Sequence, residues 1–215
     1  MTAPTSERRI EWPKLAAVGV VCMGQTFALA LAASVIPTVF REQGLELKDL
    51  WVFSLLMVPV WLRWLWAPLV DRYGSRRFGR RTSWIVPMTL GAATAYASLA
   101  FWAPDPAHLG PVAVTLVVAA FVFQTQDIAV DAYTLDAFEP HERGPGSGVK
   151  TAFESLGDAV AGAGLLLLYS AYGWQAMVCA AALALLVFSS PVLFRRETER
   201  VAPEAVRARP PSILA

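Results

Sequence analysis

Long apolar stretches alternate with short polar connections along the whole chain. Six stretches are long enough to cross a membrane, at residues about 15–40, 50–70, 82–103, 110–135, 149–171 and 174–194. A membrane-spanning helix needs about 20 mostly apolar residues. The connections carry charges, prolines or glycines, which end helices. Because lipid cannot pair with backbone polar groups, the pattern predicts an all-α integral membrane protein with six transmembrane helices.

Composition supports a membrane protein. Hydrophobic residues make up 56% of the 215 residues, and charged residues only 16%, against about 25% in ordinary soluble domains. The net charge of +1 gives no reason to expect a nucleic-acid partner. Cys22 and Cys179 lie in apolar stretches, and His108 and His141 lie in connections without zinc-ligand spacing. We therefore expect neither a metal site nor a cofactor.

Basic residues are distributed unevenly between the two sets of connections. Of the 18 Lys and Arg, 15 fall at the chain ends and in the connections after the second and fourth stretches, whereas the opposite connections hold only Arg41 and Lys48. Because Lys and Arg accumulate on the cytoplasmic side, both termini are predicted to be cytoplasmic. The expected organisation is a cytoplasmic segment 1–14, a six-helix bundle 15–195 and a disordered cytoplasmic tail 196–215, which is polar and proline-rich.

Polar and ionisable side chains gather in the second, fourth and fifth stretches: Arg63, Gln124, Gln126, Asp127, Asp131, Glu154 and Asp158. Such residues are costly inside a bilayer and mark functional sites. Asp127 and Asp131 are four residues apart and share a helix face, and so do Glu154 and Asp158.

The connection between the fourth and fifth stretches is short, so we expect all four carboxylates at similar depth, where one arginine cannot neutralise them. The cluster suits a proton relay or a cationic solute, with Arg63, Gln124 and Gln126 binding solute or forming an ion pair. Two structural alternatives stay open: Asp131 at the membrane interface and Arg63 as a purely structural ion pair. Glycines Gly157, Gly162 and Gly164 are expected to permit close helix packing, and Pro59 and Pro68 to kink the second stretch.

The connection after the second stretch carries a motif: Asp71-Arg72-Tyr73-Gly74 followed by Gly79-Arg80-Arg81. It resembles the loop signature of the major facilitator superfamily, in which an acid, a basic residue and a glycine turn precede a basic pair. The longer segments 65–72, 79–84, 126–132 and 142–144 resemble the branch that holds muropeptide permeases, acetyl-CoA transporters and siderophore permeases.

This resemblance implies transport by alternating access between two six-helix bundles. Members usually carry twelve spans in two halves, and this chain resembles the N-terminal half. The resemblance therefore implies a half-size, proton-coupled permease of a bacterial inner membrane that moves a bulky siderophore-type or muropeptide-type solute. The second bundle would be an identical chain or a separate C-terminal half. The cytoplasmic gate would comprise the five motif residues, Asp71, Arg72, Gly74, Arg80 and Arg81.

Two other functions are compatible with the residues. The chain could be a non-transporting subunit or a truncated remnant of a twelve-helix permease. An intramembrane aspartate hydrolase would use paired carboxylates to activate water. Asp127 and Asp131 lie on one helix, however, with no Ser/His or metal constellation beside them. We therefore expect a transporter and not an enzyme.

Overall fold

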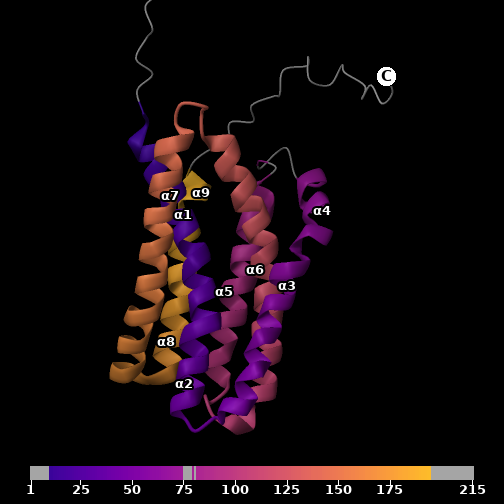
Figure 1. Ribbon diagram of the computed structural model, residues 1–215, viewed down its shortest axis with the longest axis vertical. Helices are drawn as coiled ribbons and strands as arrows, with labels where there is room; N and C mark the ends of the chain where they lie inside the picture. Colours follow the sequence, from indigo (N-terminus) through magenta and orange to yellow (C-terminus); the bar gives the residue numbers. More distant parts are fainter. Residues whose placement is uncertain (1–9, 75–78, 80, 195–215) are drawn as a thin grey trace, which may run out of the picture.

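The computed structural model describes residues 10–74, 79 and 81–194. Every regular element among these residues is helical, and the helices stand side by side in one elongated bundle (Figure 1). Four helical segments within the described part are long and apolar enough to cross a membrane: Trp12–Glu42, Thr82–Phe101, Pro106–Ala137 and Arg143–Ser189. The described fold is therefore that of an all-helical, multi-pass membrane protein.

The first apolar stretch forms one continuous rod. It comprises α1 (Trp12–Ala30), the π-helical turn η1 (Leu31–Val35) and α2 (Ile36–Glu42). The rod packs along α7 and also contacts α6 and α8, so two thirds of its most apolar window is buried. Gly44, with a φ of 95°, turns the chain after α2, a conformation that glycine adopts without strain.

The second stretch is helical but interrupted. It runs through the 3₁₀ segment η2 (Leu47–Leu56), α3 (Met57–Leu62), the 3₁₀ turn η3 (Arg63–Leu65) and α4 (Ala67–Arg72). The expected kink lies between Pro59 in α3 and Pro68 at the start of α4. Proline has no N–H to continue the helical ladder, and the chain changes direction between α3 and α4 (Figure 1).

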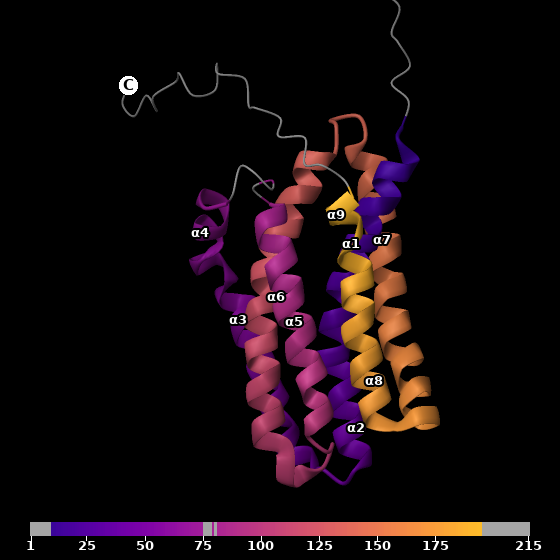
Figure 2. The same ribbon diagram turned by 180° about the vertical axis from the view of Figure 1, so that it is seen from behind.

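The third and fourth stretches form an adjacent pair. They comprise α5 (Thr82–Ser98) with η4 (Leu99–Phe101), and η5 (Pro106–His108) with α6 (Leu109–Ala137). Helix α5 packs on α6 and α8, and α5 and α8 stand together on the face shown in Figure 2. Buried Tyr96 of α5 donates a hydrogen bond to the Ala28 carbonyl of α1 at 3.2 Å, which ties this layer to the central rod.

The remaining elements are α7 (Arg143–Ala159), the π-helical turn η6 (Val160–Gly164), α8 (Leu165–Ser189) and α9 (Pro191–Phe194). As one straight helix, the 47 residues of Arg143–Ser189 would measure about 70 Å, twice the hydrocarbon thickness of about 30 Å. Gly173, with φ 82° and ψ −177°, breaks the helix, and the chain reverses direction within this segment (Figures 1 and 2).

The start of α1 and the end of α9 lie at the same end of the bundle (Figure 1). That end also carries α4 and the connection between α6 and α7. This arrangement is the one expected if both termini face one side. Six membrane crossings and the cytoplasmic position of the termini stay predictions, as do the predicted segments 1–14 and 196–215, which lie largely or wholly outside the described residues.

Candidate functional site

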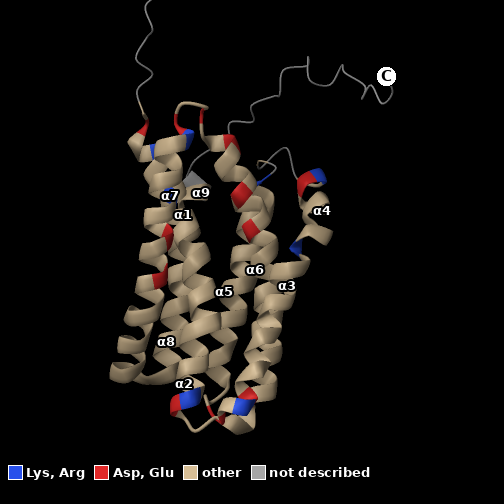
Figure 3. Cartoon of the chain, viewed as in Figure 1, with Lys and Arg blue, Asp and Glu red and all other residues tan. Residues whose placement is uncertain are grey.

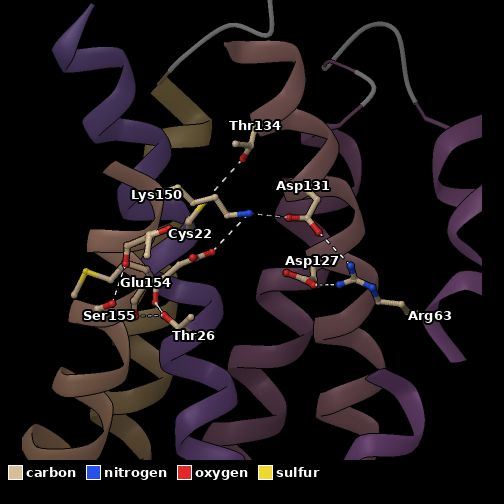
Figure 4. Close-up of polar contacts among 11 residues, drawn as sticks. Cys22, Thr26, Arg63, Asp127, Asp131, Thr134, Lys150, Glu154 and Ser155 are labelled. Atoms are coloured by element: carbon tan, nitrogen blue, oxygen red, sulfur yellow. Dashed lines mark hydrogen bonds and ion pairs between the residues drawn. The ribbon is translucent and has the colours of Figure 1, made fainter. Parts of the chain in front are cut away.

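Five charged side chains from three segments form one ion-paired cluster (Figure 4). The Arg63 guanidinium of η3 contacts Asp127 of α6 and lies 3.4 Å from the Asp131 carboxylate. On the other side of Asp131, the Lys150 ammonium lies 3.2 Å from Asp131 and 3.6 Å from Glu154 of α7. Acidic positions on α6 and α7 also lie well inside the length of the bundle (Figure 3). The structure thus brings Arg63, Asp127, Asp131 and Glu154 together, as the sequence predicted.

The break in the second stretch positions Arg63. The short turn η3 carries Arg63 between α3 and α4, and α3, η3 and α4 all pack on α6. The Arg63 side chain is 41% exposed, whereas the Asp127 side chain is 17% exposed. An arginine fork that spans two carboxylates one turn apart holds both in a fixed geometry.

Lys150 is the member that the sequence analysis placed elsewhere. The sequence analysis counted Lys150 among the basic residues of the connection after the fourth stretch, at the edge of a span expected to begin at about residue 149. Helix α7 instead begins at Arg143, so Lys150 lies about two turns inside it. At that position the ammonium reaches α6, and the expectation that Arg63 alone faces the carboxylates was wrong: two cations face Asp127, Asp131 and Glu154.

A close contact between α1 and α7 forms a wall beside the ion-paired cluster. Thr26 of α1 donates a hydrogen bond to the Glu154 carbonyl at 2.7 Å. A Cβ on Gly157 would lie 2.4 Å from the Met23 carbonyl oxygen, so Gly157 permits this approach, as predicted. No such role belongs to Gly162, where a Cβ would meet nothing within 4 Å, or to Gly164, where it would meet only Val160 at 3.8 Å.

Two pockets run along this wall. A pocket of about 240 Å³ is lined by side chains from α1, α6 and α7: Gln25, Thr26, Leu29, Phe123, Gln124, Asp127, Asp131, Lys150 and Glu154. A second pocket of about 490 Å³ shares Thr26, Leu29 and Glu154 with the first and includes Asp158. Asp158 therefore lines the neighbouring pocket and is not part of the ion-paired cluster.

The two predicted glutamines of α6 lie in different environments. Gln124 is buried and lines the smaller pocket. Gln126 is also buried, but its amide donates hydrogen bonds to the hydroxyls of Thr89 in α5, at 2.9 Å, and Ser189 in α8, at 3.3 Å. Gln126 thus links three helices and does not line either pocket. Gln25 of α1, absent from the predicted set, lines the pocket with Gln124.

The predicted gate motif lies at the end of the bundle that carries α4. Arg81 donates a hydrogen bond to Asp71 at 2.6 Å, and its Nε lies 3.5 Å from the Asp136 carboxylate at the end of α6. Arg72 and Gly74 are exposed, and Arg80 lies outside the described residues. The turn conformation belongs to Gly79, which has a φ of 91°.

A second ion pair at the same end joins α1 to the connection after α6. Buried Glu142 accepts hydrogen bonds from Lys14 and from the backbone amides of Glu139 and Glu11. Burial raises the pKa of Glu142, but these hydrogen bonds and the charge of Lys14 outweigh burial and lower it to about 2. The Glu142 carboxylate is therefore ionised at neutral pH. The sequence analysis did not assign Glu142 a role in joining α1 to this connection.

Comparison with known proteins decides the family. The model of the Major Facilitator Superfamily matches residues 15–215. The chain belongs to the major facilitator superfamily. It is 31% identical over 171 residues to the anhydromuropeptide permease of Escherichia coli K12, an alignment that covers 79% of this chain and 35% of that permease.

Two other curated proteins are also similar to this chain. A putative transporter AmpG 4 of Rickettsia conorii is 25% identical over 178 residues, which cover 80% of this chain and 43% of that protein. An uncharacterized protein of Haemophilus influenzae is 27% identical over 173 residues, which cover 80% of this chain and 40% of that protein. The chain thus spans less than half the length of these curated relatives, and its resemblance to the muropeptide-permease branch is confirmed.

The similarity to permeases points to a transporter rather than an enzyme. The carboxylates of the cluster are each held by a cation, unlike two acids that share a proton to activate water. Within the part of the chain that the structure describes, no group of three or more His, Cys, Asp or Glu side chains could hold a metal ion.

Proposed function

We propose that this chain is a six-helix half of a proton-coupled secondary transporter in a bacterial inner membrane, with both termini cytoplasmic. Its solute is a bulky organic molecule of the siderophore or muropeptide class. The observation that carries the proposal is the ion-paired cluster of Arg63, Asp127, Asp131, Lys150 and Glu154 beside a polar pocket. The relationship to the anhydromuropeptide permease supports the solute class.

The cluster provides a physical basis for proton coupling. Three carboxylates, Asp127, Asp131 and Glu154, face two cations, so full ionisation leaves one excess negative charge in a segment that lipid surrounds. Uptake of one proton removes that charge and leaves two ionised carboxylates facing two cations. In this scheme Arg63 and Lys150 exchange partners as the proton arrives, and the carboxylates carry it.

A second six-helix bundle completes the pathway. The pockets are lined by polar and charged groups of α1, α6 and α7, and Thr151, Ser155 and Asp158 of α7 are exposed. Polar groups that face lipid are unfavourable, so a partner bundle covers this face and the solute binds between the two. The motif at Asp71 and Arg81 then forms a cytoplasmic latch that opens and closes as the bundles rock.

Uptake into membrane vesicles tests the transport proposal. Asp127→Asn is expected to abolish accumulation driven by a proton gradient while leaving downhill exchange, because a neutral amide cannot carry the proton. Glu46→Gln is the matched control, because Glu46 pairs with Lys48 at an exposed position. Accumulation that does not depend on the gradient would contradict proton coupling, and absence of uptake in every partnered form would contradict transport.

Cross-linking in native membranes tests the partner. In a background in which Cys22 and Cys179 are replaced by Ser, Ser155→Cys places a thiol on the exposed polar face of α7, and Leu183→Cys places one on the apolar outside of α8. We expect Ser155→Cys alone to give a cross-linked species, at twice the chain mass for a homodimer or another mass for a separate half. A chain found only as a monomer with both variants contradicts the proposal.

A further inference from the structure

Two buried glutamines line the smaller pocket, and each has one side-chain amide atom without a hydrogen-bond partner among the described residues. Gln25 of α1 and Gln124 of α6 are 7% and 5% exposed, and both line the pocket. The Gln25 Nε2 donor and the Gln124 Oε1 acceptor are buried and have no hydrogen-bond partner among the described residues. Each helix thus contributes one buried amide, one with an unused donor and the other with an unused acceptor.

Unpaired buried amides are costly, because the hydrogen bonds they lose to water are not replaced. The same helix shows that this fold can satisfy such a group: Gln126, 4% exposed, donates to Thr89 and Ser189. Gln124 is two residues away and equally buried, yet its Oε1 is left without a partner. The contrast points to a group that enters the pocket and supplies the missing bonds.

We propose that Gln25 and Gln124 form an uncharged subsite that recognises an amide group of the solute. The proposal rests on the transport function above and specifies part of its solute. The solute carbonyl accepts a hydrogen bond from Gln25, and the solute N–H donates one to Gln124. A side-chain amide turned end for end still offers one donor and one acceptor, so an amide matches the pair in either orientation.

The surroundings favour a small group over a partner helix as the occupant. The two unpaired atoms are covered by this chain, so a helix packed on the outer surface does not reach them, and a solute group meets them only once the glutamine side chains turn into the pocket. Leu29 and Phe123 supply apolar contacts in the same pocket, and Asp127, Asp131, Lys150 and Glu154 supply charge beside it. The solute therefore combines an amide and hydrocarbon with a charged group.

The test is binding of matched probes to the full chain in lipid nanodiscs, measured by calorimetry. The sugar pair is N-acetylglucosamine and glucose, and the peptide pair is a dipeptide and its ester analogue, which lacks the amide N–H. Wild-type protein is expected to bind the amide member of at least one pair about fivefold to tenfold more tightly, the value of about one hydrogen bond. The pair that shows this preference identifies the source of the amide.

Variants connect the preference to the two residues. Gln25→Met and Gln124→Met keep the side-chain length but remove the amide, and Gln43→Met is the matched control, since Gln43 bonds Tyr169 at an exposed site away from the pocket. Both pocket variants are expected to lose the amide preference and to raise the melting temperature of the empty protein, because an unpaired buried polar group is removed. A merely structural role would predict an unchanged preference.

Each result bears on the subsite directly. Equal affinity for both members of each pair, a preference that survives in both pocket variants, or no binding of any probe overturns it. If the wild-type protein prefers the amide probes but shows no vesicle uptake, transport is overturned and the subsite is not. Gradient-driven uptake by the Gln25→Met/Gln124→Met variant with wild-type solute affinity overturns the subsite but not transport.

Discussion

The contact between α1 and α7 at Gly157 gives the sharpest test of the fold. In Gly157→Ala the new Cβ would lie 2.4 Å from the Met23 carbonyl oxygen and 2.5 Å from the Thr26 hydroxyl. The first atom belongs to the backbone, so α1 and α7 must separate by about 1 Å to reach ordinary contact. Overpacking of this kind costs about 1–3 kcal/mol, and the separation also stretches the Thr26–Glu154 hydrogen bond of 2.7 Å.

The matched control is Gly148→Ala in the same helix, where a Cβ meets nothing within 4 Å. Both variants gain the preference of alanine over glycine for helix, about 0.5–1 kcal/mol, so their difference isolates the clash. We expect Gly157→Ala to unfold more easily than Gly148→Ala by about 1–3 kcal/mol in detergent, followed by tryptophan fluorescence. Equal stability, or greater stability of Gly157→Ala, would refute the packing argument.

Three further predictions concern the ion pairs. Arg63→Gln leaves the Asp127 carboxylate without its guanidinium partner, so the double variant Arg63→Gln/Asp127→Asn should have a higher unfolding midpoint than Arg63→Gln alone; the reverse order would contradict the pairing. The lowered pKa of Glu142 means that its stabilising contribution is complete above the ordinary value of 4.5 and is lost as pH falls towards about 2. The melting temperature of Glu142→Gln should therefore fall less than that of wild type on acidification, and parallel curves would count against this. Asp71→Asn should slow vesicle uptake while changing the melting temperature little, because the Asp71 side chain is 55% exposed; unchanged uptake would remove the latch role.

Hydropathy located the helices well because it depends on composition over a window of about 20 residues. Five of the six predicted stretches correspond to the four helical segments that are long and apolar enough to cross a membrane, and the last two stretches share Arg143–Ser189. The window does not detect the hydrogen-bonding pattern of the backbone. The second stretch was therefore predicted as one span kinked by Pro59 and Pro68, whereas it is a series of four short helical pieces. The start of α7 was misjudged by six residues because Gly144, Gly146 and Gly148 resemble a loop in composition.

That boundary error explains why Lys150 was missed. The abundance of Lys and Arg in cytoplasmic connections makes a basic residue near a predicted span end look like a topology signal. The relevant signal was periodicity: Lys150, Glu154 and Asp158 recur at intervals of four and share one face of α7. The structure confirms the first contact at 3.6 Å. Partners on another helix, such as Asp131, depend on tertiary packing that no spacing within α7 encodes.

The glutamines of α6 show where spacing alone could have gone further. Successive helical residues are about 100° apart, so Gln124 and Gln126 differ by about 200° and cannot face the same pocket. Gln124, Asp127 and Asp131 follow the i, i+3, i+7 pattern of one face, and these three line the pocket. Gln126 necessarily faces the other way, where Thr89 and Ser189 satisfy its amide. Periodicity could therefore have separated the pocket-lining glutamine from the structural one. Gln25 of α1, by contrast, becomes part of the site only once α1 is packed against α6 and α7.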